Sequence, residues 1–324
     1  MACVILAGDI GGTHTRLALV DRDPRAPVAM EVYASREHGS LEEMAAAFLR
    51  AHPAELSAAC FGVAGPVLGG AVDVTNLAWP VRAASLAASL NLAHVLLLND
   101  LEANAWGLAA LAPGDLHTLN EGDPGAAGNA AVCSAGTGLG EAGLYWDGRR
   151  HRPFAGEGGH ADFAPLDERQ ARLREFLAAE YGHVSYERVC SGMGLVNIYR
   201  FLAGSCPLDA AAISEAALAR TDAHAVEALD MMVSIYGAEA GNLALKLMAT
   251  GGVYLGGGIA PRILDKLEDG TFMAAFVAKG RFRDLLASIP VHVILNDRTA
   301  LMGAALRAAE TLGEAAAGDR VRPG

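Results

Sequence analysis

Short apolar runs that end at glycine alternate along the chain with stretches in which apolar residues recur at helical spacing. The first run, from Cys3 to Ala7, stops at Gly8-Asp9, and a second run over 15–20 follows Gly11-Gly12. Two apolar runs on either side of a glycine turn predict a β-hairpin. By the same criteria the first third of the chain predicts a helix over 41–51, strands over 58–63 and 95–98, and a helix over 101–111.

The order of strand, glycine turn and strand occurs again from Asn129 onward. It is preceded by a segment rich in Gly, Asp and Pro, 113–128, which predicts a loop or a domain edge. Helices are expected to dominate between 167 and 248, and the polar tail over 313–324 is expected to fray. The remaining predicted elements are strands over 130–133, 143–146, 253–255 and 291–295 and a last helix over 299–312. Strands that alternate with helices indicate an α/β fold.

The composition is that of an ordinary globular protein, with 52% hydrophobic and 19% charged residues among 324. The length allows two domains, each with its own core. No apolar run approaches the roughly 18 residues that span a bilayer, and the first ten residues lack the basic start of a secretory signal. The net charge of −12 disfavours nucleic-acid binding. Five scattered cysteines without a C-x-x-C pair argue against a disulfide framework or a zinc site, so we expect a cytoplasmic protein.

Two glycine turns carry the first candidate chemistry. In Gly8-Asp9-Ile10-Gly11-Gly12-Thr13 the paired glycines let backbone N–H groups approach an anion, the threonine adds a hydroxyl donor, and the aspartate can hold a hydrated magnesium ion. The alternative is a tight hairpin with a solvated aspartate. Gly136-Thr137-Gly138-Leu139-Gly140 fits neither the dinucleotide-binding fingerprint nor a Walker A loop. Two glycine-threonine turns in matching contexts favour the binding of a polyphosphate from two sides.

Two further segments lie where predicted strands end. Gly256 to Gly258 follow a strand, and they could expose bare backbone to a flat ligand or permit close packing of a helix on a strand. Asn99 and Asp100 follow another strand, at the kind of position where α/β sheets gather ligands. A carboxylate there could act as a general base, yet both residue types are also favoured helix caps.

Two acidic segments in the second half of the chain are candidates for ligand contact. Glu157 and His160 belong to a loop too rich in glycine to be a helix, so they could face a ligand or form a surface turn. They lack the cysteine or second histidine of a zinc site. Glu187, taken alone, predicts a solvated helix residue or an acid in a first helical turn.

Taken in chain order, six segments resemble the bacterial glucokinase family, a hexokinase-like branch of the actin-type ATPase fold. They are Gly-Asp-Ile-Gly-Gly-Thr at 8–13, Leu-Asn-Asp-Leu-Glu-Ala at 98–103, Ala-Gly-Thr-Gly-Leu-Gly at 135–140, Gly-Glu-Gly-Gly-His-Ala-Asp-Phe-Ala-Pro at 156–165, Glu-Arg-Val-Cys-Ser-Gly at 187–192 and Gly-Gly-Val-Tyr-Leu-Gly-Gly-Gly-Ile at 251–259. One such segment is weak evidence, but six in the right order over nearly the whole chain are highly specific.

The resemblance implies a two-lobed α/β protein with its active site in the cleft between the lobes. The small α/β lobe would be 1–110 plus 299–324, and the large α+β lobe 111–298. Gly8, Asp9, Ile10, Gly11, Gly12, Thr13, Gly136, Thr137 and Gly138 would bind the phosphates of ATP, with Mg²⁺ as cofactor, and Gly256, Gly257 and Gly258 would lie near the adenosine. Asn99, Asp100, Glu157, His160 and Glu187 would bind the sugar, with Asp100 accepting the proton of its 6-hydroxyl.

The activity implied by this resemblance is ATP-dependent phosphorylation of glucose to glucose 6-phosphate. A kinase for another hexose, such as mannose or fructose, stays open because residue types do not fix the geometry of a sugar site. A non-catalytic sugar-sensing regulator on the same fold is a third alternative, which the net charge of −12 disfavours. The resemblance also suggests a homodimer.

Overall fold

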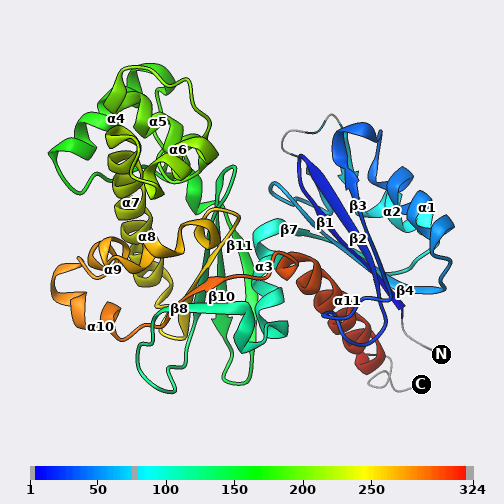
Figure 1. Cartoon of the computed structure of the whole chain (residues 1–324). Helices are drawn as coiled ribbons and strands as arrows, with labels where there is room; N and C mark the ends of the chain where they lie inside the picture. The colour runs from blue at the N-terminus through cyan, green and yellow to red at the C-terminus, as the bar shows by residue number, and fades with distance from the viewer. Residues whose placement is uncertain (1–3, 75–76, 78, 319–324) are drawn as a thin grey trace. The chain divides into compact units, whose positions relative to one another are not determined.

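The computed structural model describes residues 4–74, 77 and 79–318, and its α/β elements fall into two compact units (Figure 1). The first unit combines the chain up to Ala112 with the segment from Arg298 onward, and the second is Pro113–Asp297. Cys3 and the tail over 319–324, both covered by our sequence predictions, lie outside the described residues. The expected α/β class is confirmed.

The first unit is built on a five-stranded sheet in the order β3-β2-β1-β4-β7. β1 and β2 form the antiparallel hairpin that the glycine turn predicted, whereas β4 and β7 run parallel to β1. A separate two-stranded sheet pairs β5 with β6. The strands are β1 (Val4–Ile10), β2 (His14–Val20), β3 (Ala29–Ala34), β4 (Leu56–Val63), β5 (Ala71–Asp73), β6 (Pro80–Arg82) and β7 (Val95–Asn99).

Helices cover both faces of this sheet. On one face α1 (Leu41–Ala51) and α2 (Ala83–Leu90) pack through Phe48 and Leu86, and on the other α3 (Asp100–Gly107) and α11 (Thr299–Gly318) form a core rich in alanine. The predicted helix over 101–111 ends earlier as an α-helix and finishes with a 3-10 turn. The last helix was predicted over 299–312, and α11 continues to Gly318 because the added residues include helix-forming alanines.

The second unit contains a six-stranded sheet in the order β11-β10-β9-β12-β13-β8. Its strands are β8 (Leu116–Asn120), β9 (Ala130–Ala135), β10 (Leu139–Trp146), β11 (His151–Gly156), β12 (Gly252–Gly256) and β13 (Val291–Ile294). The second glycine hairpin, β9–β10, is confirmed. The segment 113–128, expected to be a loop or a domain edge, begins the second unit and also contains the strand β8, which pairs antiparallel with β13 at the edge of the sheet.

Most helices of the second unit lie between β11 and β12. They are α4 (Glu168–Tyr181), α5 (Gly192–Ala203), α6 (Ala210–Leu218) and α7 (Ala223–Leu247), and three short helices follow β12: α8 (Leu264–Glu268), α9 (Thr271–Phe276) and α10 (Arg283–Ala287). α7 passes through the core, where the Tyr236 hydroxyl donates to the carbonyl oxygen of Cys133 at 2.8 Å. None of the helices in the part of the chain that the structure describes has the length and apolar character needed to cross a bilayer.

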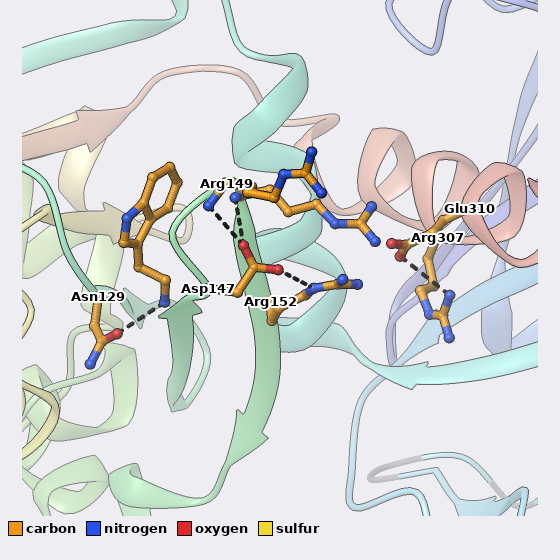
Figure 2. A network of polar contacts seen from close by, with 8 residues as sticks. Asn129, Asp147, Arg149, Arg152, Arg307 and Glu310 are labelled. Carbon is orange, nitrogen blue, oxygen red and sulfur yellow. Dashed lines mark hydrogen bonds and ion pairs between the residues drawn. The ribbon is translucent and has the colours of Figure 1, made fainter. Parts of the chain in front are cut away.

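The turn between β10 and β11 is closed by Asp147 (Figure 2). One carboxylate oxygen accepts the backbone N–H groups of Arg149 and Arg150 at 2.9 Å, and the other accepts Nε–H of Arg152 at 2.9 Å. These bonds, above all the one from the Arg150 backbone, lower the pKa of Asp147 to about 2. The same figure shows the contact of Arg307 with Glu310 along α11, 3.4 Å long.

Candidate active site

In the first unit the ends of three parallel strands bring distant candidate residues to one edge of the sheet. Ile10 at the end of β1 is in register with Val63 of β4, and Val63 is in register with Asn99 of β7. The turn over 11–13 and the Asn99-Asp100 pair therefore lie at the same edge, where α/β sheets commonly bind ligands. Gly8 and Ile10, in contrast to the turn, belong to β1 and have strand neighbours on both sides, and Ile10, the last residue of the strand, is fully buried.

The first glycine turn is fixed by a serine that sequence reasoning missed. Gly11 donates its N–H to the carbonyl oxygen of His14 at 3.0 Å. The Ser35 hydroxyl donates to the Gly11 carbonyl at 2.7 Å, and the Ser35 N–H donates to the Thr13 carbonyl at 3.0 Å. These contacts attach the turn to the segment that follows β3 and fix the conformation of its backbone. No local pattern marks Ser35, because the contact joins segments more than 20 residues apart.

Asp9 and Asp100 lie on the same face of this sheet edge, on either side of Gly62. Asp9 is in register with Gly62, and a Cβ atom placed on Gly62 would lie 2.7 Å from the Cβ of Ala103 and 3.8 Å from the Cα of Asp100. The absence of a side chain at Gly62 lets α3 start close to the sheet. Arg16 forms an ion pair with Asp9, with 3.6 Å between Nη1 and Oδ2, so the region is not purely acidic.

Asn99 and Asp100 differ in how their side chains are used. Asn99 is buried, and its Oδ1 accepts the N–H groups of Leu101 at 2.9 Å and Glu102 at 3.3 Å while its Nδ2 donates to the Gly65 carbonyl. It caps α3, as its position predicted. Asp100 is only partly buried, and its Oδ1 accepts the Leu101 N–H at 3.0 Å. The helix start thus orients a carboxylate that solvent still reaches.

Substitution of Gly62 by alanine tests this close packing. The added methyl group would lie too close to the Cβ of Ala103, so α3 must move away from β4 and carry the Asp100 backbone with it. We expect the turnover number to fall about tenfold, because small displacements of a reacting group have large effects. Steady-state kinetics measures the change. Gly39→Ala, whose new methyl would meet only ordinary contacts, is the control and should behave as the wild type.

In the second unit the two other glycine segments meet at the ends of β9 and β12. Ser134 is in register with Gly256, and the Ile259 N–H donates to the Ala135 carbonyl at 3.2 Å. Gly257 has a positive φ of 81°, and a Cβ there would clash with the Ala135 carbonyl oxygen. Gly257 therefore permits close packing against β9, one of the two alternatives that the sequence left open, and it is exposed at the surface of the second unit.

Glu187 is attached directly to the second glycine turn. Its Oε2 accepts the Leu139 N–H at 3.1 Å, and a Cβ on Gly138 would clash with the same oxygen. The residue is an acid in the first turn of the 3-10 helix η5 (Tyr186–Arg188), the second of the two alternatives that its position predicted, and it is partly buried rather than solvated. Gly136 in turn accepts the N–H of Gly192, at the start of α5, at 2.8 Å. The turn at 136–138 is thus held by two separate segments.

Glu157 comes directly before the short 3-10 helix η4 (Gly158–His160), and His160 is the last residue of this helix, which packs on the start of β10. Both side chains are more than half exposed, and their closest N and O atoms lie 4.0 Å apart. Gly159 between them is buried, and a Cβ there would clash with the carbonyl oxygen of Leu139. The same Leu139 binds Glu187, so the structure brings these three candidates to one end of the sheet.

A magnesium ion bound with a nucleotide fits the carboxylates at the edge of the first unit. Among residues 4–74, 77 and 79–318, no three or more His, Cys, Asp or Glu side chains gather as a metal-binding group. Magnesium in kinases needs no such group, because one or two carboxylates, water and phosphate oxygens complete its shell. Asp9, half-buried beside the first glycine turn, is suited to that role.

Comparison with known proteins gives one consistent family. The Glucokinase family model matches residues 6–311. A glucokinase of Synechocystis sp. is 40% identical, with 96% of this chain and 99% of the relative covered. The crystal structure of a glucokinase from an Antarctic psychrotroph has a TM-score of 0.85 at 30% identity, covering 96% and 100% of the two chains. A ROK family glucokinase from Streptomyces griseus, solved with glucose and AMPPNP, shares the fold with a TM-score of 0.66 at 21% identity, covering 95% and 99%. The chain therefore belongs to the glucokinase family, and its reaction is the phosphorylation of glucose.

Proposed function

We propose that the chain transfers the γ-phosphoryl group of ATP to the 6-hydroxyl of glucose, with Asp100 as the general base. The observation that carries this proposal is the placement of Asp100 at the first unit's sheet edge, next to the glycine turn and Asp9. The Leu101 N–H fixes one carboxylate oxygen at 3.0 Å. The other oxygen would accept the hydroxyl proton as the sugar oxygen attacks phosphorus.

The two units described above correspond in this proposal to the small and large lobes. The turns at 11–13 and 136–138 would bind phosphate oxygens through backbone N–H groups, and Gly257 and Gly258 would lie against the adenosine. Asp9 would hold a hydrated Mg²⁺, which when bound neutralises charge on the phosphates. The AMPPNP bound in the Streptomyces griseus relative supports ATP as donor.

The sugar would be held by Glu157, His160 and Glu187 in the second unit, with Asn99 positioning the start of α3. Polar groups held in a fixed arrangement around a bound sugar discriminate against sugars that lack a hydroxyl, because one of these groups is then left without its hydrogen-bond partner. Glu187 would also couple sugar binding to the second glycine turn through its bond to Leu139.

A coupled assay of ADP release with MgATP and a panel of hexoses tests the proposal. Glucose is expected to give the highest kcat/KM. A higher value for mannose or fructose would keep the kinase reaction and change its sugar, and no turnover with any hexose would favour a sugar sensor. Cytoplasmic location and a homodimer stay predictions, the second of which light scattering on the purified protein tests.

A further inference from the structure

A buried carboxyl group lies directly beneath the segment that carries Glu157 and His160. Glu141, on β10, is only 3% exposed, and its Oε1 has no hydrogen-bond partner among the described residues. A Cβ on Gly158 would clash with its other oxygen, so the η4 segment forms the cover over this carboxyl group. An unpartnered buried oxygen costs free energy and therefore requires an explanation.

A second buried carboxylate, that of Glu239, lies in the same region and already accepts hydrogen bonds from the polar side chains around it. Glu239 on α7 is fully buried; its two oxygens accept from Lys246 at 3.2 Å and from Asn242 at 2.8 Å. Lys279 lies behind Asn242, to whose side-chain oxygen it donates at 2.6 Å. Glu141 thus faces a second carboxylate, Glu239, to which the nearby lysine and amide already donate.

The other titratable neighbours of Glu141 contribute no positive charge. Cys133 is its direct strand partner on β9, and Cys190 follows η5; burial raises the pKa of both thiols. Burial likewise raises the pKa of Tyr186, which bonds Asn242. For Glu141 itself, burial and then the charge of Glu239 raise the pKa to about 8, although the positive charge of Lys246 acts in the opposite direction. At neutral pH it therefore retains its proton.

We propose that Glu141 is a positioning residue that holds the Gly158–His160 segment against β10 only while its carboxyl group is protonated. Loss of the proton to solvent leaves a carboxylate beside the Glu239 carboxylate in a site that water does not reach. Hydration of that charge requires the cover to lift, because Gly158 has no side chain that could supply a donor. The segment would then move Glu157 and His160 away from the sugar, a step that rests on their proposed role above.

The test is the pH dependence of the KM for glucose between pH 6.5 and 9.5. In the wild type we expect a constant KM up to about pH 8 and then a rise approaching tenfold per pH unit, with a smaller change in kcat. Glu141→Gln retains the shape of the side chain but has no ionisable group, so the KM of this variant for glucose should stay constant over the same pH range. Glu215→Gln, on an exposed face of α6 in the same unit, should follow the wild type. An equal alkaline rise in Glu141→Gln, or no rise in the wild type, overturns the proposal.

A second measurement needs no variant and no activity. Hydrogen exchange of the backbone amides over 157–161, corrected for intrinsic rates, should show protection that falls above pH 8. Unchanged protection between pH 7 and 9 overturns the proposal even if Glu141→Gln fails to fold. Absence of hexose turnover at any pH would contradict the proposed function alone, since the exchange result does not depend on it.

Discussion

Replacing Asp100 by asparagine is expected to lower kcat by about 100- to 10,000-fold, the range that general-base catalysis contributes. Asparagine retains an oxygen that can accept the Leu101 N–H, so the start of α3 should keep its geometry. It cannot accept a proton from the sugar hydroxyl at neutral pH. The coupled ADP-release assay measures the loss, and titration of tryptophan fluorescence with glucose measures binding, which should change by no more than a few-fold.

A matched substitution separates this chemical effect from a general effect on the first unit. Asp73→Asn makes the same exchange on the exposed side of β5 and should leave both constants unchanged. Turnover of Asp100→Asn within threefold of the wild type would exclude Asp100 as the base. A fall in glucose affinity as large as the fall in kcat would instead make it a binding residue.

Both hairpins were predictable because each depends on a local pattern of apolar run, glycine turn and apolar run. The strand β8 was not, because Gly and Pro surround its five residues and its pairing partner, β13, is more than 170 residues further along the chain. The sequence pattern predicts that the last helix ends at 312, whereas it continues to Gly318. The alanines at 315–317 continue the helix, since alanine has the highest helix propensity.

The sequence alone identified the residue types of the candidate site, but it did not predict how these residues are arranged in space. The position of Asp9 beside Gly62 and Asp100 depends on the register of three parallel strands, which no local pattern specifies. The bond from Leu139 to Glu187 joins segments 48 residues apart. The family resemblance named these residues together, whereas the structure supplies a packing reason for Gly62, Gly138 and Gly159.

The sequence around Glu141 is unusual for a buried strand, although no prediction was made from it. A glutamate within the apolar strand Leu139-Gly-Glu-Ala-Gly-Leu is unexpected in a buried sheet, because burial of a charge without compensation is costly. Its partner Glu239 lies on a helix almost 100 residues later, so the pair itself could not be predicted. A charged residue inside a predicted central strand is therefore worth testing as an ionisable group with a displaced pKa.

Replacing Gly159 by alanine is expected to raise the KM for glucose by about 100-fold or more. The new methyl group would clash with the Leu139 carbonyl oxygen, which belongs to a strand and cannot move aside, so η4 must shift. Hydrogen bonds to Glu157 and His160 would both be lost, each worth about 1.5–3 kcal/mol, and 1.4 kcal/mol corresponds to tenfold. Glucose titration and steady-state kinetics measure the effect. Gly114→Ala, where no atom lies within 4 Å of the added methyl, is the control, and an equal KM in both variants would show that η4 does not position the sugar.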